Sequence, residues 1–270
     1  MRLLFSEAKP DYGNYIFPYA VWAFPEPGET PAQIFAAGFL PSSRQLDRFY
    51  LCRQTRVRLD KFQPSSENRR ILRKGNGIQV QLLSRSEFEF TAARRNFCKR
   101  YTDTKFGENG MSLERLDSLF HSPVTSHVLL FCESTEGREI GIATLYLEGT
   151  AMAFYYYAFY DLDRGSGSLG MFMMTEAVSR FAARGSKYLY LGSCYSENAL
   201  YKTQFAGFEF FNGVRWSENL EELKFILKRQ QQADLRQHLF EDDEFRTDFA
   251  SGDLASQAPF LVRIPPLDGE

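Results

Sequence analysis

The stretch AMAFYYYAFYDLDRGSGSLGMFMMTEAVSRFAARGSKYLYL, residues 151–191, decides the fold of this chain. Residues 151–160 are almost all apolar or aromatic, which is typical of a buried strand, and a glycine-containing loop follows at 161–167. The apolar stripe of the next helix consists of Leu169, Phe172, Met173, Ala177 and Phe181. Gly185 ends this helix, and residues 187–191 form a short strand that is apolar enough to be central in a sheet.

The segments on either side extend this pattern into an α+β architecture. Upstream, residues 127–132 and 140–147 are predicted strands. Nearer the N-terminus, the periodicity predicts helices at 31–39, 66–74 and around 90–101, and strands at 55–60 and 78–82. We therefore expect a mixed β-sheet flanked by helices, arranged in two lobes.

The composition divides the chain into three predicted regions. Residues 1–85 form a basic N-terminal lobe, and residues 86–216 form the domain that contains the stretch quoted above. In the last region, 217–270, the first part to residue 240 is expected to be helical. Residues 241–270 are acidic and contain proline, so we expect an extended tail there.

The net charge hides an uneven distribution of charged residues. The 270 residues carry 32 Lys and Arg against 34 Asp and Glu, a net charge of -2 that argues against a nucleic-acid partner. Residues 44–105, however, hold 16 basic and 6 acidic residues, whereas residues 217–270 hold 6 basic and 12 acidic residues. The local excess of positive charge favours binding of a polyanion.

Several classes of protein are excluded by simpler features. No apolar run approaches the roughly 20 residues of a membrane span, and the N-terminus becomes polar too early for a signal peptide. The four cysteines lie far apart without CxxC spacing, and the three histidines are scattered. We therefore expect free thiols in a reducing cytoplasm, with no metal and no cofactor.

The densest basic cluster lies at residues 62–74. On a helix, Arg69 lies over Arg73, and Arg70 lies over Arg73 and Lys74. Each like-charged pair costs about 0.2–0.5 kcal/mol, which a bound phosphate would offset. The alternative is a solvated face that Glu67 partly neutralises. Arg53, Arg56 and Arg58 upstream, together with the basic residues at 94–100 downstream, favour the polyanion.

Two further groups of polar residues follow predicted strands. Tyr160, Asp161 and Asp163 emerge where the aromatic strand meets the loop, and a carboxylate there can orient or deprotonate an amine. Alternatively, the two aspartates are turn or cap residues. After residues 188–192, Tyr201 and Lys202 are placed to line a pocket; the alternative is an exposed lysine beside a packed tyrosine.

Motifs in family order resemble the arginyl-tRNA–protein transferase family, including its bacterial leucyl-transferring branch. They are Cys52-Arg53, Arg56-Val57-Arg58, Phe62-Gln63-Pro64-Ser65, Arg69-Arg70-x-x-Arg73-Lys74, Phe159-Tyr160-Asp161, Ser168-Leu169-Gly170, Tyr188-Leu189-Tyr190-Leu191-Gly192 and Tyr201-Lys202-x-x-Phe205. They span roughly residues 15 to 216. The resemblance implies a fold similar to that of GNAT acyltransferases, with an aminoacyl-tRNA as donor and the N-terminal amine of a protein or peptide as acceptor.

The resemblance also suggests roles for particular residues. Asp161 would orient or deprotonate the amine, Tyr160 would donate to the developing oxyanion, and Lys202 or Arg58 would pair with a carboxylate of the acceptor. The residues expected to bind tRNA are Arg53, Arg58, Arg69, Arg70, Arg73 and Lys74. Those expected to contact the substrates are Tyr157, Ser168, Tyr190, Glu197 and Tyr201.

The chain departs from the family pattern in two places. Thr55 stands where a C-R-x-C element has its second cysteine, and residues 10–30 contain no cysteine, so the family's cysteine-rich region is missing. Residues 193–200 are shorter than their counterpart and differ in sequence. The amino acid that is transferred, its acceptor and the oligomeric state are therefore not predicted.

Two alternative functions remain open at this point. One is a conventional acyl-coenzyme A N-acyltransferase of the GNAT fold, which holds the pyrophosphate on an R/Q-x-x-G-x-G/A loop. In residues 164–170, Arg164 and Gly167 fit that loop, but Leu169 occupies its last small position and Gly170 comes one residue late. The other alternative is a catalytically inactive tRNA-binding protein.

Overall fold

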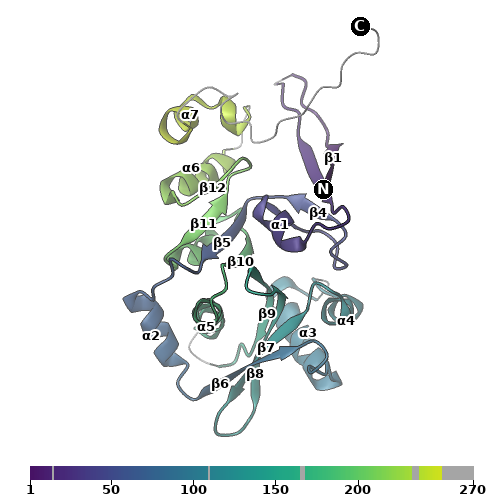
Figure 1. The fold of residues 1–270 in the computed structure, drawn as a ribbon, viewed down its shortest axis with the longest axis vertical. Helices are drawn as coiled ribbons and strands as arrows, with labels where there is room; N and C mark the ends of the chain where they lie inside the picture. Colours follow the sequence, from purple (N-terminus) through teal and green to yellow (C-terminus); the bar gives the residue numbers. More distant parts are fainter. Residues whose placement is uncertain (14, 109, 165–167, 233–236, 251–270) are drawn as a thin grey trace.

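The computed structural model describes residues 1–250 except 14, 109, 165–167 and 233–236 (Figure 1). The strands are β1 (Arg2–Glu7), β2 (Tyr19–Phe24), β3 (Phe39–Pro41), β4 (Phe49–Leu51), β5 (Gln54–Arg58), β6 (Ile78–Ser84), β7 (His127–Glu133), β8 (Glu139–Glu148), β9 (Met152–Tyr160), β10 (Tyr188–Ser193), β11 (Phe208–Phe211) and β12 (Trp216–Ser217). The α-helices are α1 (Pro31–Ala36), α2 (Ser66–Lys74), α3 (Ala92–Phe106), α4 (Leu113–His121), α5 (Leu169–Ala183), α6 (Leu220–Gln230) and α7 (Asp243–Phe249). Two 3₁₀ helices, η1 (Glu197–Gln204) and η2 (Leu239–Glu241), complete the described elements.

The larger sheet has eight strands in the order β12-β11-β5-β10-β9-β8-β7-β6. Strands β9 and β10 are parallel, because α5 carries the chain back between them, and the other neighbours are antiparallel. The smaller sheet, β1-β2-β4-β3, is antiparallel throughout. The predicted α+β class is confirmed, and so is the order of strands, helix and strand predicted for residues 127–191.

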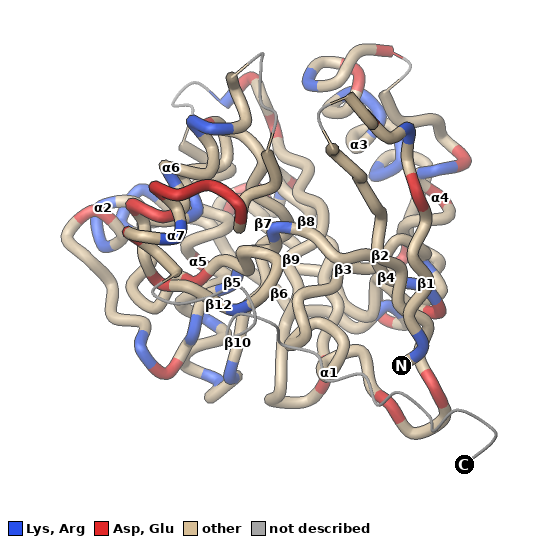
Figure 2. Tube along the Cα trace, turned by 90° about the horizontal axis from the view of Figure 1, so that it is seen from above, with Lys and Arg blue, Asp and Glu red and all other residues tan. Residues whose placement is uncertain are grey.

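Helices cover both faces of the large sheet (Figure 2). Alternate residues of β7 enter different cores: Val128 packs with α3 and α4, whereas Leu129 packs with α2 and α5. This alternation explains why the central strands are apolar on both sides. Strands β5 and β6, although they come from residues 1–85, are part of the same sheet as strands from residues 86–216.

The extended tail predicted for residues 241–270 is wrong for its first part. Residues 239–249 form η2 and α7, where Phe245 is fully buried and its ring lies 6.0 Å from that of Phe225 in α6. The acidic composition obscured this aromatic contact surface, which supplies the apolar burial that an extended tail lacks. The remainder of the predicted tail, residues 251–270, lies outside the described residues.

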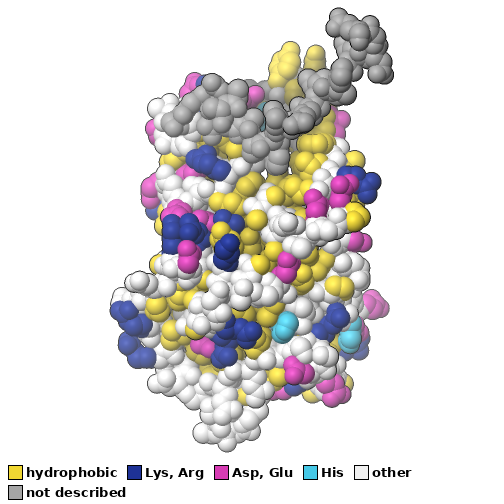
Figure 3. All heavy atoms as spheres, viewed as in Figure 1, with side chains coloured by type: hydrophobic (Ala, Val, Ile, Leu, Met, Phe, Trp, Pro, Cys, Tyr) yellow, Lys and Arg dark blue, Asp and Glu magenta, His cyan; other side chains and the backbone are white. Residues whose placement is uncertain are grey.

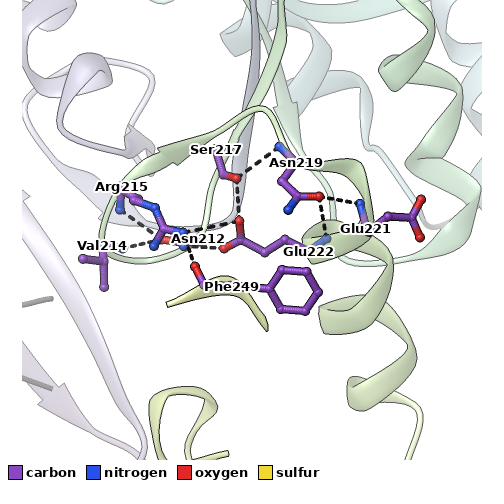
Figure 4. Close-up of polar contacts among 8 residues, drawn as sticks. All are labelled: Asn212, Val214, Arg215, Ser217, Asn219, Glu221, Glu222 and Phe249. Carbon is purple, nitrogen blue, oxygen red and sulfur yellow. Dashed lines mark hydrogen bonds and ion pairs between the residues drawn. The ribbon is translucent and has the colours of Figure 1, made fainter. Parts of the chain in front are cut away.

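A buried carboxylate joins β12, α6 and α7 (Figure 4). Glu222, 1% exposed, accepts hydrogen bonds from Asn212 Nδ2 at 2.7 Å and Ser217 Oγ at 2.5 Å. Arg215 Nη2 lies 3.6 Å from Glu222 Oε2 and also donates to the carbonyl of Phe249 at 2.6 Å. One side chain of α6 thereby fixes the end of α7 against the sheet.

Candidate active site

A cavity of about 510 Å³ opens where β9 and β10 part. Their parallel pairing ends at Phe154 and Tyr190, after which β9 continues beside β8 and β10 continues beside β5. The wedge between them is lined by Tyr101 and Phe106 of α3, Tyr155, Tyr156, Tyr157, Ala158 and Tyr160 of β9, Gly170, Met171 and Met174 of α5, Leu191 of β10, and Tyr201 and Lys202 of η1. Ligand sites of open α/β sheets lie at such carboxyl ends, where neighbouring strands diverge.

Irregularities in both strands shape this opening. Thr144 pairs with Tyr157 and Leu145 with Tyr155, so Tyr156 is an extra residue in β9. On the other side, Leu191 is the extra residue of β10 opposite β5. Bulges of this kind re-aim side chains, which explains why consecutive residues of β9 reach one cavity instead of alternating between the faces.

Lys202 is the basic side chain among the described residues that line the cavity. It is 8% exposed, and its Nζ donates to the carbonyl of Ser193 at 2.8 Å. Burial lowers the pKa of its ammonium group below the ordinary value of 10.5. The alternative of an exposed lysine beside a packed tyrosine is therefore wrong. Lys202 is the buried residue of the two, and Tyr201 is 46% exposed.

Gly170, in the first turn of α5, allows the ring of Tyr160 to pack closely against this helix. A Cβ atom at Gly170 would lie 2.8 Å from Cε1 of Tyr160, so a larger residue would displace the ring. On its other side, the ring centroid of Tyr160 lies 4.8 Å from that of Tyr101. Gly170, which comes one residue late for a coenzyme A loop, therefore has a different function here: it makes room for the Tyr160 side chain.

Four of the predicted site residues line this cavity, namely Tyr157, Tyr160, Tyr201 and Lys202. Asp161 does not line it. The Asp161 carboxylate accepts from Arg138 Nη1 at 3.2 Å and from the backbone N–H of Asp163 at 3.0 Å. This arrangement favours the interpretation of Asp161 as a turn residue over that of a base.

Three other predicted substrate contacts lie elsewhere. Tyr190, 1% exposed, packs between Phe35 and Trp216 and lies on the far side of β10 from α5. Glu197 is exposed and accepts from Gln231 Nε2 at 3.4 Å. Ser168 is the N-cap residue of α5, directly after residues 165–167, which lie outside the described part of the chain.

The coenzyme A-like loop is described only at its edges. Gly165 and Gly167 are not among the described residues. Arg164, which fits the first position of the motif, has its Nη1 atom 2.9 Å from Glu133 Oε1. The loop arginine is therefore engaged by a carboxylate of β7.

The basic helix α2 lies at one side of the molecule, where Figure 3 shows its cationic side chains at the surface. Arg69 donates to the carbonyl of Pro64, and Arg70 pairs with Glu67. Arg73 and Lys74 are exposed and have no carboxylate partner within the described chain. This geometry is compatible with both predictions, a solvated face and a phosphate site. Of the four cations of α2, Glu67 neutralises Arg70 alone.

A chain of contacts connects α2 with the cavity wall. Ser65 caps the helix by accepting from the backbone N–H of Asn68. The buried Asn68 faces Gln204 of η1, with Nδ2 3.5 Å from Oε1, and Gln204 Nε2 lies 3.8 Å from Met171 Sδ. The basic helix is thus attached to the same η1 segment that carries Tyr201 and Lys202.

Arg53 and Arg58 occupy opposite ends of β5. Arg53 precedes Gln54, which pairs with Ser193 at the cavity end of β10, and its guanidinium lies 5.0 Å from the ring of Tyr195. Arg58 pairs with Tyr188 at the far end and forms an ion pair with Asp60 at 3.0 Å. The two are five positions apart along the extended chain, a distance of about 16 Å, so only Arg53 lies at the cavity end.

Much of the positive charge at 44–105 is compensated within the protein. Arg56 is buried against Glu209 at 2.6 Å, between the rings of Tyr188 and Trp216. The downstream pairs are Arg94–Glu139, Arg95–Asp117 and Lys99–Asp103. The count of charged residues in the sequence therefore overstates the positive potential at the surface. Arg56 and residues 94–100 give little support to the predicted binding of a polyanion.

Sequence reasoning missed Tyr101 and Tyr155 as cavity residues. The sequence places Tyr101 in a predicted helix and Tyr155 in a predicted buried strand, and Tyr155 is indeed buried whereas Tyr101 is half-buried. The signal that distinguishes them is the divergence of β9 from β10, which depends on strand pairing rather than on local sequence. The four cysteines are buried free thiols, and the described residues contain no group of three or more His, Cys, Asp or Glu side chains suited to a metal ion.

Helices that cross a membrane are not found in the described part of the chain: none is long and apolar enough. Among solved structures, the C-terminal domain of a putative lysylphosphatidylglycerol synthetase from Agrobacterium fabrum aligns with a TM-score of 0.42 and 14% identity, over 53% of this chain and 46% of that one. FemX aligns with a TM-score of 0.39 and 10% identity, over 52% of each chain.

Comparison with known sequences finds several curated relatives of this chain. No family model matches the chain. The aspartate/glutamate leucyltransferase of Sphingomonas elodea is 26% identical over 176 residues, 62% of this chain and 66% of that protein. The proteins of the same name from Chromobacterium violaceum and Methylorubrum extorquens are 24% and 29% identical, over 70% and 52% of this chain and 80% and 60% of theirs.

The chain thus matches about two thirds of the length of these curated relatives. The matches recur across several bacteria under one name. By sequence the chain is similar to the aspartate/glutamate leucyltransferases, and the resemblance predicted from its motifs is confirmed.

Proposed function

We propose that this protein is an aminoacyl-tRNA-dependent transferase that moves an amino acid onto an amine, the N-terminus of a protein or peptide. The observation that carries the proposal is the cavity at the parting of β9 and β10, with the buried Lys202 in its wall and the basic helix α2 attached to the same η1 segment. The names of the relatives support it. The reaction would take place in the cytoplasm, where charged tRNA is found.

The chemistry is aminolysis of an ester. A neutral amine attacks the aminoacyl carbonyl, a tetrahedral oxyanion forms, and the ribose oxygen leaves. Because the ester is already activated, positioning and oxyanion stabilisation supply most of the rate. Tyr160 and Lys202 line the cavity as candidate donors, and Tyr157 and Tyr201 form its aromatic walls.

The tRNA would be held by Arg69, Arg73 and Lys74 of α2 and by Arg53 at the cavity end of β5. Arg70 and Arg58 are engaged by Glu67 and Asp60, so their contributions are smaller. The division at residues 85 and 216 remains part of this proposal, with α2 in the first region and the cavity in the second.

The lining of the cavity favours an uncharged donor amino acid. The described lining residues include no carboxylate, but they include six tyrosines and two methionines. A guanidinium in this cavity would remain unpaired, at a cost of about 1–3 kcal/mol or more. We therefore expect transfer of leucine, methionine or phenylalanine to exceed transfer of arginine by roughly 10–100-fold.

Incubation with separately charged, radiolabelled tRNAs and a set of acceptor peptides measures this preference. Transfer of arginine as fast as leucine would contradict it. Stabilisation by coenzyme A in a thermal-shift titration, with none by any charged tRNA, would contradict the proposed function as a whole and favour an acyl-coenzyme A enzyme.

Removal of the free cations of α2 is expected to weaken tRNA binding. The variant Arg69→Ala/Arg73→Ala/Lys74→Ala would bind tRNA roughly 10–100-fold less tightly and would lower the slope of log K against log salt by about 2–3. Filter binding between 50 and 300 mM salt measures both quantities. Lys228→Ala, an exposed lysine of α6, is the control; an unchanged slope in the triple variant would mean that α2 is only a solvated face.

A further inference from the structure

The hydroxyl group of Tyr155 stands out among the polar atoms of the cavity. The Tyr155 side chain is 5% exposed and lines the cavity, and its Oη atom is buried without a hydrogen-bond partner in the described chain. A buried hydroxyl group that is left unpaired costs about 1–3 kcal/mol. Because the unpaired hydroxyl group belongs to a residue that lines the cavity, it can form a hydrogen bond with a ligand that enters the cavity.

The position of Tyr155 follows from the strand pairing. Phe154 is the last residue of β9 that pairs with β10, so Tyr155 is the first residue beyond the point where the strands part. Its ring packs in the core between the sheet and α5, which holds it rigid. Tyr155 therefore lies at the inner end of the wedge, where a reacting group is most fully removed from water.

The other hydroxyl groups of the cavity differ from that of Tyr155. Tyr201 is 46% exposed, and Tyr160 is half-buried beside Tyr101. Burial raises the pKa of Tyr155 well above its usual value, and the neighbouring tyrosines add to this. Tyr155 therefore keeps its proton at any working pH and serves as a hydrogen-bond donor rather than a base.

We infer that Tyr155 Oη donates a hydrogen bond to the carbonyl oxygen of the aminoacyl ester as that oxygen becomes an oxyanion. This inference rests on the proposed function and adds to it a catalytic residue. Lys202, in the wall of the same cavity, supplies the positive charge that complements the donor.

The reaction forms one C–N bond and breaks one C–O bond. The lone pair of the neutral acceptor amine forms the new C–N bond, and the electron pair of the C=O bond moves onto oxygen, where the Tyr155 hydroxyl group stabilises it. When the tetrahedral intermediate collapses, the C=O bond re-forms and the C–O bond to the ribose breaks. The proton that the attacking nitrogen loses passes to the departing ribose oxygen.

Tyr155→Phe tests the inference because it removes one oxygen atom that has no internal partner. We expect kcat to fall about 100-fold with KM nearly unchanged, the effect of losing one oxyanion donor. The melting temperature should stay the same or rise. Tyr146→Phe is the matched control: Tyr146 of β8 donates to Glu148 at 3.3 Å and is outside the cavity lining, so its rate should be unchanged.

Binding provides a second measurement that does not need turnover. The 3′-adenosyl ester of leucine phosphonate is a tetrahedral anion, whereas the 3′-leucylamido adenosine carries a planar carbonyl. By calorimetry, Tyr155→Phe should weaken binding of the phosphonate about 100-fold and binding of the amide no more than about threefold.

The outcomes separate the two proposals. If the wild-type protein transfers leucine and Tyr155→Phe transfers it at the same rate, the role of Tyr155 is overturned and the function stands. An equal loss of affinity for both analogues together with a lower melting temperature would indicate a structural role and also overturn it. If the wild-type protein transfers no amino acid from any charged tRNA, the proposed function fails, and the inference fails with it.

Discussion

Lys202→Met is expected to lower kcat/KM for aminoacyl transfer by about 1,000-fold, the upper end of the range for loss of one oxyanion donor. The ammonium group of Lys202 lies in the wall of a cavity that contains no carboxylate among its described lining residues. Lys202 is only 8% exposed, so its positive charge interacts more strongly than in water with an anion that develops on the substrate. Methionine keeps the length of the side chain, but it removes the charge and the hydrogen bond to the carbonyl of Ser193. Single-turnover transfer of labelled leucine measures the effect.

Lys202→Met should lose activity without losing stability near neutral pH. Burial depresses the pKa of Lys202, so its charged form carries a desolvation penalty in the folded protein. Between the depressed pKa and 10.5 the unfolded chain binds more protons, so this group makes stability rise with pH across that window. The variant should lose this rise. Near neutral pH the desolvation penalty that it removes offsets the lost hydrogen bond to Ser193, so it should melt no lower than the wild-type protein.

Lys187→Met is the control for this experiment. Lys187 is exposed just before β10, at the end away from the cavity. The transfer activity of the Lys187→Met variant should match that of the wild-type protein. If Lys202→Met transferred leucine at the wild-type rate, the cation would have no role in the reaction.

Glu222→Ala is expected to destabilise the protein by about 3–5 kcal/mol, which is the usual effect of removing one member of a buried polar network. Asn212, Arg215 and Ser217 would each lose a partner. Because Arg215 also holds the carbonyl of Phe249, α7 should detach first. Urea unfolding measures the free energy, and hydrogen exchange of the amides of residues 243–249 reports the loosening of α7.

The adjacent residue provides a matched control. Glu221 is one position earlier in α6 (Figure 4), but its side chain is 73% exposed and pairs with Lys224. Glu221→Ala should change the free energy of unfolding by about 0.5 kcal/mol or less. Similar losses for Glu221→Ala and Glu222→Ala would show that the buried network contributes nothing specific.

The central part of the fold was predictable because its signals are local. Helix α5 and strands β7 to β10 lie close to the ranges that periodicity and glycine positions indicate. The smaller sheet was not predicted, because β3 and β4 have three residues each and show no clear period. Helix α7 was missed because the acidic residues around Phe245 outweighed a contact with α6 that only the tertiary structure provides.

The candidate site was predictable in its composition and not in its geometry. Tyr157, Tyr160, Tyr201 and Lys202 belong to motifs and do line one cavity. Asp161 was a candidate because it follows a strand. Its carboxylate instead pairs with Arg138 of the β7–β8 connection and does not line the cavity. A count of charged residues along the sequence likewise cannot show that Glu209 neutralises Arg56, because the two are 153 positions apart.

The central position of β5 has a consequence for how the chain folds. Thr55 bonds the carbonyl of Gly192, 137 residues later, and β11 on its other side follows later still. During synthesis β5 leaves the ribosome long before either neighbour exists, with both edges unpaired and prone to wrong pairing. Non-local pairing of this kind slows folding, so the sheet can close only after residue 211 has emerged, and a chaperone that shields residues 54–58 until then would raise the yield of folded protein.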